Sequence, residues 1–281
     1  MSDNRTVVGA VRRGDITDAF REVGVGDGDI LLIHSSLKSF GYVEGGAMSV
    51  IEAAKAAVGE DGTVVFSTLV QRDFEHAYRN WNRETSPSDV GTITEVFRTL
   101  PGTLRSDQAT HSVAAQGKKA AWLTGEHCAY GPRMGIFGDY CFSYSSPWQK
   151  MYMENAKIVF IGVPTLYNTF KHFVEYSLVE YYLGLISPAE EKCAAMSEVA
   201  VYRQIERGEP RGVWPFHSTE QTDELLKEHG LIRYADCGSS HFTMIEAKPY
   251  VDTVLAAFKA GPENWFDEGF VGWLKKYHCV P

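Results

Sequence analysis

Near the middle of the chain, a short apolar run is followed by a longer segment whose apolar positions recur every three or four residues. The run Ile158–Val163 is rich in β-branched residues, which predicts a buried strand. Asn168 or Thr169 is placed to cap a helix that begins near Phe170. This strand and helix are the elements around which the rest of the chain is expected to be organised.

The predicted helix is apolar on nearly all sides, so we expect it to be buried. His172 and Glu175 are three residues apart and therefore neighbours on one side of it. A carboxylate that holds an imidazole fixes the ring and raises its basicity, as in a general base. The same spacing also fits a structural ion pair, and the pattern alone leaves both alternatives open. The opposite face consists of Phe170, Phe173, Val174, Ser177, Leu178 and Tyr181.

Strand and helix patterns alternate along the first part of the chain, which favours βαβ units and hence a mixed, largely parallel sheet. The absence of repeats, low-complexity tracts and linkers favours a single domain over residues 1–281. Residues 199–204 favour a strand or a helix. The other expected strands are 29–34, 63–70, 110–115 and 241–245, and the other helices are 15–23, 48–58, 92–100, 148–154, 223–229, 250–260 and 270–277.

The segment Gln71–Val90 is polar, aromatic and without a clear period. Loops of this length inside a compact domain are usually functional. Asp73, Glu75 and Glu84 are the kind of residues that would bind a polar, cationic sugar. A solvated surface loop is the alternative.

Composition narrows the class of protein. The net charge of −9 argues against a nucleic-acid or anionic-membrane partner. No apolar run is long enough to cross a bilayer, and the N-terminal residues lack a signal-peptide core, so we expect a cytoplasmic protein. The five cysteines are scattered and form no C-x-x-C pair, which predicts reduced thiols rather than disulfides or a cysteine zinc site.

Three polar segments follow or abut predicted strands, and ligands of open α/β sheets bind beyond strand carboxyl ends. No G-x-S-x-G motif supports a serine hydrolase, and no H-E-x-x-H motif supports a zinc hydrolase, so no metal is expected. Acyl transfer to an amine remains, because it needs a base, positioning and donors for the oxyanion. The three segments begin at His34, Thr110 and Thr169.

A series of ordered motifs resembles the aminoglycoside 3-N-acetyltransferase family. The resemblance covers most of residues 30–180 and continues more loosely to the end of the chain. It implies an α/β/α sandwich, acetyl-CoA or another acyl-CoA as donor, and an amino group on a sugar as acceptor. The motifs are HSSLKSFG, GYVEGGA, GEDGTVVFST, SPSDVGTITEVFRTLPGTLRS, THSVAAQGKKA, SPW and NTFKHFVEYS.

The resemblance also implies roles for individual residues. His172 matches the general base of a direct transfer, Glu175 matches its carboxylate partner, and Thr169 matches a residue of the acceptor-site wall. A homodimer is among the expected states. The residues that match the coenzyme site are His34, Ser35, Ser36, Leu37, Phe40, Thr110, His111, Ser112 and Val113.

The chain departs from the family pattern at Gln108 and Ala109, where the family usually has a His-Pro pair. The departure bears on the identity of the acceptor. We therefore keep two alternatives to an antibiotic-modifying enzyme: an N-acyltransferase acting on a biosynthetic, nucleotide-linked amino sugar, and a non-catalytic relative that binds coenzyme A.

Overall fold

The computed structural model describes residues 9–70, 76–199, 205–206, 209–210 and 212–281. Within these ranges, seven strands form one sheet in the order β3-β4-β2-β1-β5-β9-β8. A separate pair consists of β6 (Ile205–Glu206) and β7 (Glu209–Pro210). The strands of the large sheet are β1 (Ile30–Ser35), β2 (Thr63–Ser67), β3 (Leu104–Arg105), β4 (Val113–Gly117), β5 (Lys157–Ile161), β8 (Ile232–Cys237) and β9 (Ser240–Glu246).

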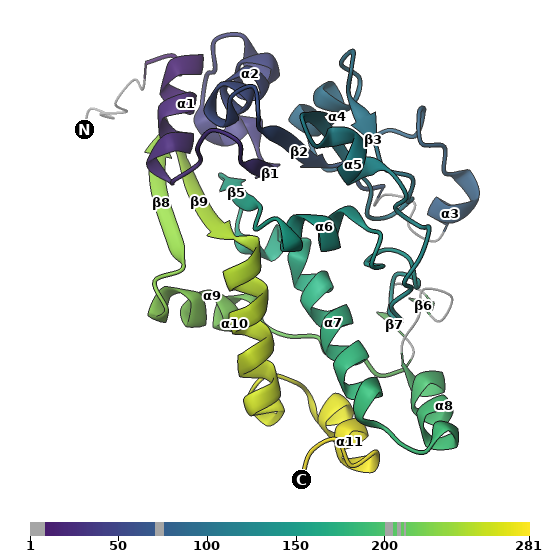
Figure 1. Cartoon of the computed structure of the whole chain (residues 1–281). Coiled ribbons are helices and arrows are strands. Elements are labelled where there is room, and N and C mark those ends of the chain that lie inside the picture. Colours follow the sequence, from purple (N-terminus) through teal and green to yellow (C-terminus); the bar gives the residue numbers. More distant parts are fainter. Residues whose placement is uncertain (1–8, 71–75, 200–204, 207–208, 211) are drawn as a thin grey trace.

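The helices pack on both faces of this sheet (Figure 1). The α-helices are α1 (Arg13–Glu22), α2 (Gly46–Val58), α3 (Ala77–Asn80), α4 (Thr92–Arg98), α5 (Ala120–Thr124), α6 (Pro147–Met153), α7 (Phe170–Leu185), α8 (Ala189–Glu198), α9 (Thr219–Glu228), α10 (Ala247–Ala260) and α11 (Glu268–Lys276). The short 3₁₀ helices are η1 (Leu37–Phe40), η3 (Thr165–Tyr167) and η5 (Pro262–Asn264).

Successive residues of the central strands point to opposite sides of the sheet and fill two separate cores. In β1, Leu31 and Ile33 pack with residues of α1, α2 and α4. Ile30 and Leu32 pack instead with residues of α6, α7 and α10. Because both faces are covered, β1 is almost uniformly apolar. The expected α/β/α sandwich is therefore confirmed.

The expectation of a largely parallel sheet is wrong. Only the three central strands are parallel, since β1 pairs in parallel with β2 and with β5. The other four neighbouring pairs are antiparallel. The β1–α2–β2 unit was predictable from its alternating pattern. An apolar run indicates that a strand is buried, but it carries no information on strand direction.

Helix α7 begins at Phe170, as predicted, and its residues are buried on nearly every side. The exposed residues of α7 are Tyr181, which we expected on the apolar face but which is 40% exposed, and Gly184 and Leu185 at the end of the helix. Asn168 supplies the predicted polar cap, because its Oδ1 accepts a hydrogen bond from the backbone N–H of Phe170. Thr169 occupies the N-cap position without a side-chain capping bond. Its hydroxyl is thus not used by the helix.

The close packing of the sheet can be tested at Gly117, the last residue of β4. Gly117 has φ +126°, and an added Cβ would lie 2.2 Å from the carbonyl oxygen of Gly62 and 2.7 Å from the Cα of Thr63. We expect Gly117→Ala to lower the free energy of unfolding by about 2–4 kcal/mol, because both the backbone angle and the space are unfavourable. Gly184→Ala in α7 is the matched control, since nothing lies within 4 Å of its added Cβ. Urea denaturation should show the control unchanged or slightly stabilised; equal effects of the two substitutions would contradict this description.

Candidate active site

The carboxyl ends of β1, β2 and β5 meet at one edge of the sheet because the three strands are parallel. Strand β4 runs the other way, and its first residue, Val113, pairs with Ser67 at the end of β2. The segment that precedes β4 therefore reaches the same edge. In this way the three polar segments singled out in the sequence are brought together.

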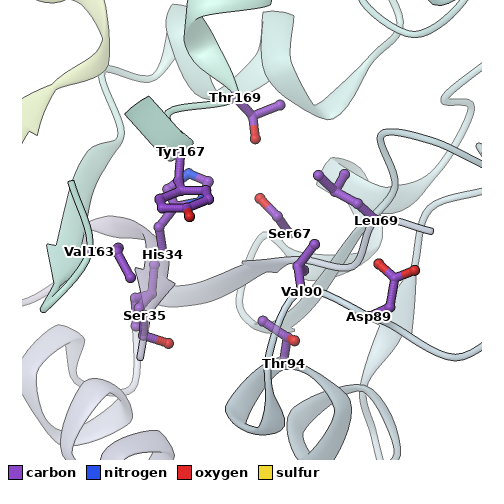
Figure 2. A pocket seen from close by; sticks show the side chains of 11 residues that line it. His34, Ser35, Ser67, Leu69, Asp89, Val90, Thr94, Val163, Tyr167 and Thr169 are labelled. Atoms are coloured by element: carbon purple, nitrogen blue, oxygen red, sulfur yellow. The ribbon is translucent and has the colours of Figure 1, made fainter. Parts of the chain in front are cut away.

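The larger of two adjoining cavities lies beyond these strand ends, with a volume of about 330 Å³. In Figure 2 the hydroxyl groups of Ser67 and Thr169 point into it. Its walls come from β1, from the segments after β2 and β5, and from the start of α4. The lining residues are Ile33, His34, Ser35, Ser67, Leu69, Asp89, Val90, Thr94, Val163, Tyr167 and Thr169.

Three buried polar atoms of this cavity wall have no hydrogen-bond partner among the described residues: His34 Nε2, Ser35 Oγ and Ser67 Oγ. Burial lowers the pKa of His34 to about 4, so its ring is neutral at neutral pH. The ring stacks on Phe160, with 5.2 Å between the centroids. Buried polar groups normally have partners. Three unpartnered ones in a single wall suit an uncharged ligand that carries hydrogen-bonding groups, such as amides.

A smaller cavity of about 130 Å³ adjoins the larger one. The two share Leu69, Tyr167 and Thr169 as lining residues. His172 lines the smaller cavity together with Thr110 and His111. A ligand extended along the larger cavity would therefore end beside the His172 imidazole.

His172 and Glu175 form the pair predicted from their spacing. The Nδ1 of His172 lies 2.8 Å from Oε2 of Glu175. The carboxylate is fully buried, whereas 24% of the His172 side chain is exposed. Since Nδ1 faces the carboxylate, Nε2 is the nitrogen that remains for a ligand. This geometry is that of an imidazole oriented by an acid.

Burial acts to raise the pKa of Glu175, but the charge and hydrogen bond of His172, aided by His217, outweigh it and hold the pKa below its usual value. Trp214 Nε1 also donates a hydrogen bond to Oε2 of Glu175, at 2.9 Å. Sequence reasoning missed Trp214 and His217. Both lie about forty residues beyond Glu175, and no local pattern connects them to α7.

His111 is a buried neighbour of His172, with 5.9 Å between the ring centroids. Its Nδ1 lies 2.8 Å from the hydroxyl of Thr110. Burial, followed by the nearby rings of His172 and His127, lowers the pKa of His111 well below its usual value. His111 therefore contributes a neutral ring to the wall of the smaller cavity.

Gln108, the residue that departs from the family pattern, is buried beneath this turn. Its Oε1 accepts hydrogen bonds from the backbone N–H groups of Thr110 and His111. Its Nε2 donates to the hydroxyl of Tyr78 at 2.7 Å. Gln108 lines neither cavity and holds the Thr110–His111 turn in place.

Several residues matched to the coenzyme site do not line the two cavities. Phe40 is fully buried in the core against Phe242. Ser112 and Val113 are fully buried, and Ser112 Oγ lies 3.0 Å from the backbone oxygen of Thr68. Ser36 and Leu37 are half-buried at the start of η1. These residues therefore lie outside the lining of both cavities.

The structure places one of the three acidic residues that are expected to bind an acceptor, Glu84. Asp73 and Glu75 lie outside the described residues. Glu84 forms an ion pair with Arg83 at 2.8 Å and borders a different cavity, next to Arg105. Among the described residues, the lining of the smaller cavity contains no carboxylate.

Comparison with known protein families shows to which family the chain belongs. A family model described as aminoglycoside 3-N-acetyltransferase matches residues 32–259. The chain belongs to this family. An aminoglycoside N(3)-acetyltransferase III from Salmonella sp is 31% identical over 180 residues, covering 58% of this chain and 59% of that protein. The matched part thus spans less than two thirds of that relative's length.

Solved structures show the same fold as this member of the aminoglycoside 3-N-acetyltransferase family. A mutant of aminoglycoside acetyltransferase AAC(3)-IVa in complex with apramycin has a TM-score of 0.66 and 23% identity, covering 90% of this chain and 94% of that one. AAC-IIIb, solved as a binary complex with CoASH, has a TM-score of 0.61 and 20% identity, covering 89% and 96%.

Across the described ranges, no group of three or more His, Cys, Asp or Glu side chains is arranged to hold a metal ion. In the same part of the chain, no helix is both long enough and apolar enough to cross a membrane.

The position of Gln108 leads to a stability prediction. We expect Gln108→Ala to lower the free energy of unfolding by about 3 kcal/mol, because it leaves buried backbone N–H groups without acceptors. Gln221→Ala, on the exposed side of α9, is the control and should change stability by less than about 0.5 kcal/mol. Urea denaturation measures both. A Gln108 variant as stable as the control would show that this side chain does not hold the turn.

Proposed function

We propose that the protein transfers an acetyl group from acetyl-CoA directly to an amino group of an aminoglycoside, the 3-amino group of 2-deoxystreptamine. The observation that carries the proposal is the His172–Glu175 pair, whose imidazole lines the smaller of the two adjoining cavities. The names of relatives agree with it: one is an aminoglycoside N(3)-acetyltransferase, one structure contains apramycin and another contains CoASH.

The larger cavity is suited to the pantetheine arm of the coenzyme. That arm is narrow, uncharged and carries two amides, which match the unpartnered polar atoms of His34, Ser35 and Ser67. Tyr167 and Thr169 line both cavities, so the thioester would lie between these residues and His172.

His172 acts as the general base in this proposal. An ammonium group must lose a proton before its nitrogen can attack the thioester carbon. Nε2 of His172 takes that proton while Glu175 stabilises the imidazolium. The new C–N bond forms and the C–S bond breaks. The departing thiolate takes the proton held by His172, and the second proton, which the nitrogen releases as it becomes an amide, passes to solvent. No acyl-enzyme is needed, because the two substrates meet in one ternary complex.

Substitution of the pair is the direct test. We expect His172→Ala to lower kcat by about 10²–10⁴-fold and Glu175→Gln by about 10²-fold, because a positioned base contributes on that scale. Thiol release from acetyl-CoA in the presence of gentamicin measures both. The control is His241→Ala, which removes an exposed imidazole paired with Asp236 on the surface. Turnover near the wild-type rate in both pair variants would rule out His172 as the base.

The acceptor is tested separately with a panel of amines. We expect acetyl-CoA-dependent thiol release with 2-deoxystreptamine aminoglycosides and none with nucleotide-linked amino sugars, since a chain of net charge −9 favours cationic ligands. Mass spectrometry of the product should show one added acetyl group at the 3-amino position. Release only with nucleotide-linked sugars would indicate a biosynthetic enzyme. Absence of release with every acceptor, while coenzyme A still binds, would indicate a non-catalytic binding protein.

A further inference from the structure

The carboxylate of Glu175 has contacts beyond His172, and they come from a distant segment. Its Oε2 accepts a hydrogen bond from Trp214 Nε1 at 2.9 Å, in addition to facing Nδ1 of His172. Its Oε1 lies 3.4 Å from Nδ1 of His217 and has no hydrogen-bond partner among the described residues. Both oxygens are therefore approached by groups from the segment between α8 and α9.

The surroundings of His217 determine its protonation. Its Nδ1 faces two acceptors, Oε1 of Glu175 and the backbone oxygen of Pro215, each at 3.4 Å. Only a protonated Nδ1 suits both. Its Nε2 is buried with no hydrogen-bond partner in the described part of the chain, and the ring packs against Phe258 at 4.8 Å. Burial lowers the pKa of His217 despite the opposing effect of Glu175, so the ring is neutral.

The segment that carries these two side chains is fixed at both ends. The backbone N–H of Val213 donates to the carbonyl oxygen of Glu198 at the end of α8, at 2.8 Å. Ser218 caps α9 by accepting a hydrogen bond from the backbone N–H of Gln221. The indole of Trp214 packs edge-on against Tyr176 of α7, with 5.1 Å between the centroids. Trp214 and His217 are thus held in place independently of His172.

We propose that Trp214 and His217 are positioning residues that hold Glu175 ionised, with Oε2 directed at His172. The proposal rests on the proposed role of His172 as the base. Without the indole N–H on Oε2 and the imidazole beside Oε1, the buried carboxylate would keep only the contact with His172 and the charge of Lys171. The titratable groups that interact with Glu175 or His172 are His217 and Lys171, together with Tyr250 from α10 and His111 from the turn before β4.

The direction in which the pH–kcat/KM profile should move follows from the chemistry of the His172–Glu175 pair. Removing a donor from Glu175 raises the proton affinity of the carboxylate. A more basic carboxylate also binds the imidazolium form of its partner more tightly. Protonation of either group stops base catalysis, so both changes move the acidic limb of the pH–kcat/KM profile toward higher pH.

The test compares matched aromatic substitutions. We expect Trp214→Phe to lower kcat about tenfold, to leave KM for acetyl-CoA within about twofold, and to move the midpoint of the acidic limb up by about 0.5–1 unit. Trp273→Phe is the control, because Trp273 is a buried tryptophan in α11 whose Nε1 has no hydrogen-bond partner among the described residues. The control should leave the midpoint unchanged.

His217 is tested with a second pair of variants. His217→Leu removes the N–H group, whereas His217→Asn places an amide N–H near the position of Nδ1. We expect the leucine variant to behave like Trp214→Phe and the asparagine variant to recover most of kcat and the wild-type midpoint. Equal behaviour of the two variants would overturn the role of His217.

A readout without turnover separates this proposal from the function itself. NMR titration of the His172 ring, assigned with His172→Ala, should show its midpoint rising in Trp214→Phe and not in Trp273→Phe. A midpoint that stays the same in Trp214→Phe, with only the folded fraction reduced, would mean that Trp214 serves packing alone. Full activity of His172→Ala would instead refute the proposed function.

Discussion

The site depends on one buried charge, the carboxylate of Glu175 on the largely buried helix α7. A charge in such surroundings is costly unless it is paired and hydrogen-bonded. Here His172 and Trp214 contact Oε2 and His217 lies near Oε1, and the pKa of Glu175 remains below its usual value even though burial acts to raise it. The requirement to satisfy this charge explains why His172 is oriented and why a distant segment returns to α7.

The direction of the strands determines what lies around that charge. Strands β1, β2 and β5 end at one edge of the sheet, and the antiparallel strand β4 begins there. A sheet with a parallel β4 would have carried the Thr110–His111 turn to the opposite edge, away from His172. The antiparallel pairing that the sequence did not predict is therefore a condition for assembling the smaller cavity.

The local pattern of apolar and polar residues was sufficient to predict features that depend on residues close together in the sequence. The start of α7, its burial and the contact between His172 and Glu175 all follow from spacing within a few residues. The β1–α2–β2 unit was also recognisable. By contrast, β8 and α8 were missed, since β8 is polar at exposed positions and α8 has only one buried residue. Weakly amphipathic elements at the edge of a fold leave little signal in the sequence.

Contacts between residues that are far apart in the sequence were not predictable from local pattern. Trp214 and His217 reach Glu175 only after the chain has folded back. The resemblance matched Phe40 and Ser112 to the coenzyme site, which stays a prediction; both side chains are fully buried and line neither cavity. A motif identifies which segment forms a wall, whereas burial decides which of its side chains face the ligand.

The histidines around the site illustrate how burial assigns chemistry. His34, His111 and His217 have lowered pKa values because burial disfavours their charged forms. An imidazole ring that cannot hold a proton at neutral pH is a poor base. It can instead form an uncharged part of the surroundings of the site. His172 differs in two respects: 24% of its side chain is exposed, and its Nδ1 is hydrogen-bonded to the carboxylate of Glu175 at 2.8 Å, whereas the buried His217 lies 3.4 Å from it. Within this group of four imidazoles, His172 therefore has the geometry that best supports its proposed role as the base, because a hydrogen-bonded carboxylate stabilises the imidazolium form.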